Sequence, residues 1–304
     1  MPEPFEIIQK PPELPRPFGL FILKAEISKG LRSTVYRAID TRDNAAVALK
    51  IFFQDPNCDL QSQRSLVDME ARRLREIAHS NIIELRQHGE VDKIPFLSFP
   101  FLNGMDLDRA MADSHISSCD LLGAMVKVCR ALQHAHAKGV IHRDLKPQNV
   151  MISLNHEPYV IDWGLSWKKG DKSDRLVQSI VGTPAYMSPE QARGEEQHLT
   201  EATDTYSLGA ILYHLLTGLA PFVSDSTWKT LQMAMLLPPH PPHTLRENIN
   251  MDLEQVVMCC LEKDPGKRYL TAEALADDLQ RVIEKQPPKG PDKPGTLFGR
   301  LFGK

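Results

Sequence analysis

One short segment of the chain combines residue types that can carry out catalysis. The sequence VIHRDLKPQNVMI, Val140–Ile152, places a histidine, two cations on either side of one aspartate, and an asparagine between two apolar flanks. Such flanks are typical of the ends of buried elements, which predicts a loop held at both sides. Loops fixed by a scaffold often carry catalytic residues. A solvated turn is the alternative, but turns favour Gly, Asn and Ser over two cations flanking a carboxylate.

A second carboxylate follows this loop. Asn149 starts the apolar segment VMI, Asp162 follows the segment YVI, and the turn-forming residues SLNHEP lie between them. If the two segments pair as an antiparallel hairpin, Asn149 and Asp162 meet at its open end, where their oxygens suit Mg²⁺. Asp144, five residues before Asn149, is then placed to accept a hydrogen bond or a proton from an attacking hydroxyl. Lys146 can lie beside it and neutralise charge on a transferred group.

An ion pair is predicted in the first half of the chain. In the strand pattern AAVALKIFF, Lys50 shares one face with the small Ala48, which leaves room for a flat ligand. Glu70 shares one face of the following helical segment with three apolar residues, Leu66, Leu74 and Ile77. An unpaired charge in an apolar stripe is costly, so we expect Lys50 to pair with Glu70. The alternative is that Glu70 turns outward to solvent.

The elements that must position these residues change character along the chain. Residues 20–53 alternate apolar and polar side chains, which predicts strands. After Asn103 and Gly104 the apolar residues recur mainly at helical spacing. The expected elements are a helix over 62–78, strands around 82–85 and 96–101, and helices over 120–138, 204–216, 252–263 and 271–284. A strand-rich half followed by a helix-rich half predicts an α+β fold in two lobes.

Length and composition exclude several classes of protein. The 304 residues are 42% apolar and 25% charged, as in globular proteins, and the length predicts more than one packed core. A net charge of -3 supplies no basic field for nucleic acid. No apolar run is long enough to span a membrane, and the N-terminal residues lack the pattern of a signal peptide. Five scattered cysteines without a CxxC pair are typical of a reducing compartment, so we expect a cytoplasmic location.

Four motifs occur in order along the chain: VALK, HRDLKPQN, DWG and GTPAYMSPE. Together they resemble the signature set of the eukaryotic-type (Hanks-type) serine/threonine protein kinases, and YMSPEQARG resembles its bacterial members. The resemblance implies a bilobal protein-kinase-like α+β fold, with a small β-rich N-lobe containing one key helix and a larger helical C-lobe. The implied domains are a Pro-rich leader over 1–17, a kinase domain over 18–285 and a Pro/Lys/Gly-rich tail over 286–304, with the N-lobe at about 18–99, the hinge at about 100–104 and the C-lobe at about 105–285.

The resemblance also implies roles for individual residues. Lys50 would bind the α- and β-phosphates of ATP and pair with Glu70, while Asp144 orients or deprotonates the substrate hydroxyl beside Lys146. Asn149 and Asp162 would hold Mg²⁺. The implied nucleotide contacts lie in the glycine-rich loop, the neighbouring strands and the hinge: Ile27, Ser28, Gly30, Ser33, Val35, Ala48, Lys50, Pro100 and Leu102.

Three further positions resemble structural residues of the family. Thr183 matches the threonine that closes the substrate site against the catalytic loop. Glu190 resembles the acid that pairs internally with a distant arginine, here Arg268. Asp204 resembles the buried aspartate that braces the backbone of the catalytic loop.

A regulatory position is implied as well. Arg143 stands where family members hold a phosphorylated activation segment, which predicts phosphorylation at Ser179 first and Ser173 second. The alternative is that Arg143 caps local backbone carbonyls and the kinase is active unmodified. The expected partners are protein substrates bearing Ser or Thr, and the tail LFGRLFGK is a candidate for contact with a partner or a membrane surface.

The glycine-rich loop departs from the family pattern. In SKGLRSTV only Gly30 remains, and Ser28 and Ser33 take the other two glycine positions. The predicted function is an ATP- and Mg-dependent protein kinase that transfers the γ-phosphoryl group to Ser/Thr hydroxyls and phosphorylates itself. The altered loop favours the alternative of a pseudokinase, a nucleotide-binding scaffold with little or no phosphotransfer, which the intact catalytic residues oppose. A small-molecule kinase is a third reading, but it would not need the segment GTPAYMSPE.

Overall fold

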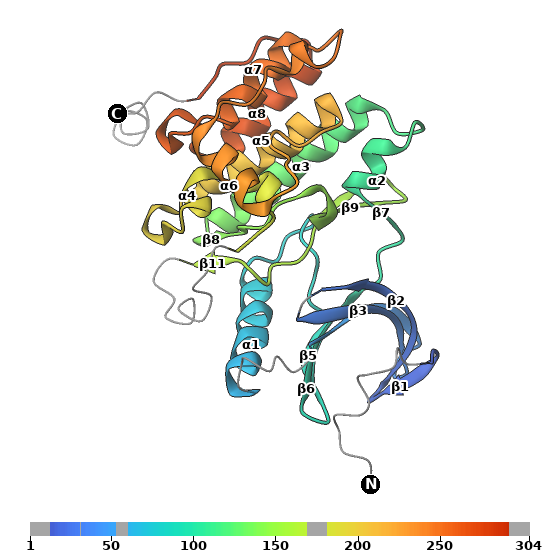
Figure 1. Ribbon diagram of the computed structural model, residues 1–304. Helices are drawn as coiled ribbons and strands as arrows, with labels where there is room; N and C mark the ends of the chain where they lie inside the picture. Colours follow the sequence, from blue (N-terminus) through green and yellow to red (C-terminus); the bar gives the residue numbers. More distant parts are fainter. Residues whose placement is uncertain (1–12, 31, 53–59, 169–180, 292–304) are drawn as a thin grey trace, which may run out of the picture. The chain divides into compact units, whose positions relative to one another are not determined.

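A computed structural model describes residues 13–30, 32–52, 60–168 and 181–291 of the chain (Figure 1). The chain divides into two compact units, and each is described by itself. The first is built from Met1–Glu76 and Ile83–Leu102, and the second from Ile77–Ile82 and Asn103–Lys304. The first unit is rich in strands and the second in helices. This α+β architecture confirms the predicted fold class.

The first unit is a curled antiparallel sheet in the order β1-β2-β3-β4-β6-β5 (Figure 1). Its strands are β1 (Arg16–Phe18), β2 (Phe21–Lys29), β3 (Ser33–Asp40), β4 (Ala45–Phe52), β5 (Gln87–Val91) and β6 (Ile94–Pro100). As the alternation in β4 predicts, Val47, Leu49 and Ile51 are buried in a core on one face. Lys50 and Ala48 occupy the opposite face of the same strand.

One helix, α1 (Leu60–Glu76), packs against β6 in this unit. Its Val67 and Ala71 are buried against Leu97 of that strand. The sequence therefore predicted the helix to within about two residues at each end.

The strand expected around residues 82–85 is wrong. Ile82 and Ile83 are buried, but Ile82 forms only an isolated bridge to Val160, and the strand that pairs with β6 on the side away from β4 is β5. The sequence of β5, QHGEV, is polar because β5 lies at the edge of the sheet, where none of its five residues is buried. The apolar residues Ile82 and Ile83 are buried without forming a strand. The edge strand β5 has no alternation of apolar and polar residues, so the sequence did not reveal it.

The second unit is mainly helical, with two small sheets in the orders β10-β9-β7 and β11-β8. Its helices are α2 (Leu107–Ala112), α3 (Ser118–His136), α4 (Pro189–Ala192), α5 (Glu201–Thr217), α6 (Thr227–Leu236), α7 (Met251–Cys260) and α8 (Ala272–Ile283). Its strands are β7 (Gly104–Asp106), β8 (Val140–Ile141), β9 (Val150–Ser153), β10 (Pro158–Val160) and β11 (Trp167–Lys168). Helix α3 packs along α8, and α5 packs against α7.

Helix α5 is buried on nearly every side, which explains why its stretch YSLGAILYHLL, Tyr206–Leu216, is mainly apolar. Gly209 makes the contact with α7 possible, because a Cβ there would lie 2.3 Å from the Cβ of Cys260. The helix ends at Gly218, whose left-handed backbone (φ 80°) lets its N–H donate to the carbonyl of His214. The four long helices expected in this half are present, and α6 is an additional one. Its outward face carries the exposed Trp228 and Leu236, which obscures its amphipathic pattern.

The end of the described chain folds back on α8. The N–H groups of Lys289 and Gly290 each donate to the buried carboxylate of Asp278 at 2.8 Å. Most of the expected leader and all of the tail segment LFGRLFGK lie outside the described residues. No helix in the described ranges is long and apolar enough to cross a membrane.

Candidate active site

The predicted hairpin that follows the catalytic loop is present. Strands β9 and β10 pair antiparallel with Val150 opposite Val160, and the N–H of Ile161 donates to the carbonyl of Asn149 at 2.9 Å. Asn149 and Asp162 therefore stand at the open end of the hairpin. The Asn149 Nδ2 group donates to the carbonyl of Asp144 at 2.8 Å, so the amide is oriented and its Oδ1 is the atom that could bind a cation. This donor set, an amide oxygen and a carboxylate, fits a hard divalent cation.

Three donors converge on the carboxylate of Asp144. Its Oδ1 accepts a hydrogen bond from the Thr183 hydroxyl at 2.9 Å. Its Oδ2 lies 3.1 Å from Lys146 Nζ and accepts from Asn149 Nδ2, also at 3.1 Å. Lys146 Nζ in turn donates to Thr183 Oγ1 at 3.0 Å. The expected contact of Thr183 with the catalytic loop is thus confirmed, and the carboxylate is held in one orientation.

The backbone of this loop is braced by Asp204 from α5. Its Oδ2 accepts from the N–H of His142 at 2.9 Å, and its Oδ1 accepts from the N–H of Arg143 at 3.1 Å. Burial alone would raise the pKa of Asp204, but the hydrogen bond and charge of His136 and the neighbouring His142 outweigh it, so the pKa is lowered. The predicted brace is confirmed.

His136 is a supporting residue that the sequence did not reveal. Its Nε2 lies 2.7 Å from Asp204 Oδ2, and both side chains are fully buried. His136 shares the inward face of α3 with Cys129 and Leu132, a position that predicts burial but not a partner. The partner lies 68 residues away along the chain.

His142 connects the catalytic loop to the segment that carries Asp162. Its Nε2 lies 3.0 Å from the carbonyl oxygen of Ile161, and its ring centroid lies 4.6 Å from that of Trp163. Trp163 of the motif DWG is buried within the second unit.

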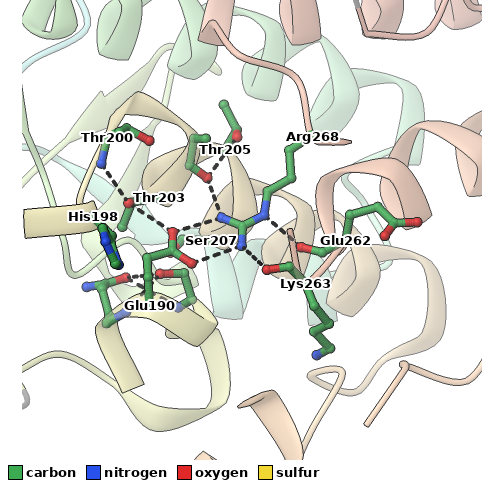
Figure 2. Close-up of polar contacts among 12 residues, drawn as sticks. Glu190, His198, Thr200, Thr203, Thr205, Ser207, Glu262, Lys263 and Arg268 are labelled. Atoms are coloured by element: carbon green, nitrogen blue, oxygen red, sulfur yellow. Dashed lines mark hydrogen bonds and ion pairs between the residues drawn. The ribbon is translucent and has the colours of Figure 1, made fainter. Parts of the chain in front are cut away.

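The predicted ion pair between Glu190 and Arg268 is present and deeply buried (Figure 2). The two guanidinium Nη atoms reach the two carboxylate oxygens at 2.8 and 2.9 Å. The remaining N–H groups donate to three backbone carbonyls, those of Ala202, Glu262 and Lys263. All five donors of the guanidinium are thus satisfied. The Thr203 hydroxyl also donates to Glu190, which ties helix α4 to α5.

In the first unit the predicted pair of Lys50 and Glu70 is present. Lys50 Nζ lies 3.0 and 3.2 Å from the two carboxylate oxygens of Glu70. Glu70 is only 3% exposed, so the alternative of an outward-turned side chain is wrong. The pair fixes a cation on the face of β4 that also carries Ala48.

The residues expected to contact nucleotide lie in the same unit on β2, β3, β4 and the end of β6. Within that sheet Ser28 is opposite Val35, and Val35 is opposite Lys50, so directly paired residues share one face. Ile27 is half exposed near the end of β2, and the N–H of Gly30 donates to the carbonyl of Ser33 at 2.8 Å. In β4, Ala48 is paired with Phe99 of β6. Pro100 is the last residue of β6, and Leu102 follows it. Their contacts with a nucleotide stay predictions.

Ser28 and Ser33 fit the loop without strain. Neither has a positive φ, and both lie within strands. Ser173 and Ser179, the expected phosphorylation sites, lie outside the described residues. The guanidinium of Arg143 lies 4.0 Å from the carboxylate of Glu196 in the described part.

The chain is similar to known protein kinases along most of its length. The model of the protein kinase domain matches residues 21–279. Serine/threonine-protein kinase PknB of Mycobacterium leprae is 34% identical over 272 residues, which cover 86% of this chain and 43% of that protein. PknB of Mycolicibacterium smegmatis is likewise 34% identical, over 86% of this chain and 43% of that protein. A probable serine/threonine-protein kinase of Corynebacterium efficiens is 31% identical over 90% of this chain and 44% of that protein. The chain thus spans less than half the length of these relatives.

Proposed function

The chain belongs to the protein kinase family, and on that premise we propose that it is an ATP- and Mg-dependent serine/threonine protein kinase that also phosphorylates itself. The observation that carries the proposal is the set of donors around Asp144. Thr183, Lys146 and Asn149 fix the Asp144 carboxylate at the end of a braced loop. A group that accepts a proton from a substrate hydroxyl must be held in one orientation in this way.

The described residues divide the reaction between them. Asp144 receives the hydrogen bond, and then the proton, of the substrate hydroxyl as that oxygen attacks the γ-phosphorus and ADP leaves. Lys146 stabilises the negative charge of the transferred group. Lys50, oriented by Glu70, holds the α- and β-phosphates. Asn149 and Asp162 would hold Mg²⁺, which supplies positive charge to the phosphates when it is bound.

The nucleotide is proposed to contact the same face of the sheet as Lys50. Ile27, Val35 and Ala48 would pack on the base and ribose, while the loop from Ser28 to Ser33 covers the phosphates. The carbonyl of Pro100 and the N–H of Leu102 would pair with the adenine. Proline suits the first role because it lacks only an N–H donor.

The second candidate is a pseudokinase scaffold, which the altered loop favours. The unstrained Ser28 and Ser33 weaken that argument, since nothing in their backbone conformation requires glycine. The hydrogen bonds of Asp144 and the ion pair of Lys50 also favour an active enzyme.

The test is transfer of labelled phosphate from Mg-ATP to Ser/Thr peptides and to the chain itself. We expect Lys50→Met and Asp144→Asn each to reduce turnover by at least about 10²-fold, which is the size of effect that loss of a catalytic group usually has. Lys24→Met and Asp225→Asn, at exposed positions of the two units, are the matched controls and should retain turnover. A wild-type chain that binds Mg-ATP but transfers no phosphate would support the scaffold instead.

Domain limits, location and partners complete the proposal. We place the kinase domain at residues 18–285, with protein substrates bearing Ser or Thr as partners. A reducing, cytoplasmic setting is supported by four described cysteines that are all free thiols: Cys119, Cys129, Cys259 and Cys260.

A further inference from the structure

Arg143, the residue before Asp144, has an unusual backbone. Its φ is +70°, in the left-handed region that L-residues with long side chains rarely adopt. Such a conformation persists only where surrounding contacts determine it, and it is common where strain serves a site. The contacts that hold Arg143 therefore decide where Asp144 stands.

Both peptide groups of Arg143 are held by buried side chains. Asp204 Oδ1 accepts from its N–H, as described above. On the other side, Gln191 Nε2 donates to the Arg143 carbonyl at 2.7 Å. That carbonyl belongs to the peptide bond that leads directly into Asp144. Gly182 leaves room for this arrangement, because a Cβ there would lie 3.1 Å from the same carbonyl oxygen.

The orientation of the Gln191 amide is determined by its neighbours. Its Oε1 accepts from the N–H and the hydroxyl of Ser188, at 3.3 and 3.1 Å. A flipped amide would set a donor against the Ser188 N–H and an acceptor against the Arg143 carbonyl, so only one orientation satisfies both sides. Gln191 is 5% exposed, which leaves little access for water to replace the bond.

The helix that carries Gln191 is itself fixed in place. It lies in α4 next to Glu190, whose carboxylate is fixed by the fully bonded guanidinium of Arg268 (Figure 2). A hydrogen bond from this helix can therefore resist movement of the catalytic loop. Asp204 thus holds the N–H side of Arg143, and Gln191 holds its carbonyl side.

We propose that Gln191 is a positioning residue for phosphotransfer, which fixes the Arg143–Asp144 peptide and thereby the direction of the Asp144 carboxylate. The proposal rests on the proposed kinase function. Without the bond, Arg143 can leave its strained conformation and carry the backbone of Asp144 with it. A displacement of about 1 Å in a reacting group can lower a rate by as much as 10²-fold. We therefore expect a substitution of Gln191 that removes this hydrogen bond to lower kcat about 10- to 100-fold, with the KM for ATP little changed.

The decisive variant is Gln191→Glu, which has the same shape. Its carboxylate can still accept from Ser188, but it presents an acceptor to the Arg143 carbonyl. Burial against that carbonyl raises the pKa of the introduced carboxyl group, and its protonated form can donate the missing hydrogen bond. The kcat of the variant, divided by that of the wild type at each pH, should therefore rise several-fold between about pH 8 and pH 6.

Two other variants separate this role from a loss of stability. Gln191→Met should be slow at every pH, because it has no group to protonate. Gln232→Glu replaces an exposed amide of α6 and should show neither the loss nor the pH-dependent recovery. A turnover of Gln191→Glu within two-fold of wild type, or a loss that is equal at every pH, would overturn the proposal.

The unfolding free energy provides a measurement that does not need activity. Relative to wild type, Gln191→Glu should gain stability as the pH falls from about 8 to 6, whereas Gln191→Met should not. If the wild type transfers no phosphate, the proposed function fails, and this measurement alone decides whether Gln191 holds the Arg143 carbonyl. An equal pH dependence in both variants would then reject the contact.

Discussion

Replacing Arg268 with Met measures how the second unit stabilises a buried charge. The substitution keeps much of the side-chain volume but removes all five N–H donors. Glu190 is only 1% exposed. Of the side-chain donors described for its carboxylate, the Thr203 hydroxyl remains after the substitution. Three backbone carbonyls lose a donor as well. Breaking a buried pair by removing one partner typically costs about 3–5 kcal/mol of unfolding free energy, and we expect a loss in that range near neutral pH.

The dependence of this loss on pH follows from the pKa of Glu190. In the wild type, burial acts to raise that pKa, but the hydrogen bonds and charge of Arg268 outweigh it, so the pKa is lowered. The ionised carboxylate therefore adds stability above the unfolded carboxyl pKa of about 4.3, and this stability is lost as the pH falls through the lowered pKa. In Arg268→Met the largest influence, burial, loses its strongest opponent and only weaker hydrogen bonds such as that of Thr203 still oppose it, so we expect the pKa of Glu190 to rise. The variant should thus recover stability as the pH falls toward about 5.

Urea denaturation at about pH 7.5 and pH 5 measures both effects. Arg109→Met, which removes an exposed arginine from α2, is the control and should change stability by less than about 0.5 kcal/mol. The double variant Arg268→Met/Glu190→Gln should lose the pH-dependent part, because no carboxylate is left to titrate. A loss below about 1 kcal/mol at neutral pH, or one that is the same at both pH values, would refute the reasoning.

Three further outcomes are expected. Asp144→Asn should bind Mg-ATP within about three-fold of wild type by calorimetry, since Asp144 is assigned to the substrate hydroxyl; a much larger loss would reassign it to the nucleotide. The double variant Ser28→Gly/Ser33→Gly should bind ATP at least as tightly as wild type but unfold more readily, by about 0.5–1 kcal/mol per glycine, and weaker ATP binding would show that the serines are adapted to this loop. Mass spectrometry after incubation with Mg-ATP should find phosphate at Ser179 first and Ser173 second, with lower activity in Ser179→Ala; full activity of both alanine variants without phosphate would contradict this.

The parts of the site that the sequence predicts are those set by local periodicity. Alternation in β4 places Lys50 on one face, and helical spacing places Glu70 among apolar residues, so the pair follows from two short patterns. The hairpin of β9 and β10 follows in the same way from two apolar segments and the turn between them. In each case the pattern and the contact lie within about 20 residues of each other, so little of the rest of the fold is needed.

The failures have a different physical origin. The edge strand β5 is polar, and the outward face of α6 carries Trp228 and Leu236, so neither element has the pattern that its type usually produces. The supporting contacts of His136 with Asp204 and of Gln191 with Arg143 span 68 and 48 residues. Burial of such polar residues can be read from a helix face, but the choice of partner depends on the packing of whole helices.

The supports of the catalytic loop form one connected network. Asp204 reaches it from α5 and Gln191 reaches it from α4, while Glu190, Thr203 and Arg268 join those two helices. Because the left-handed conformation of Arg143 is sparsely populated and depends on surrounding contacts, we expect the direction of Asp144 to depend on how rigidly these helices are joined. On the proposed role of Gln191, we therefore expect loss of the ion pair of Glu190 and Arg268 to lower turnover as well as stability. Removing it loosens the base from which Gln191 holds the loop.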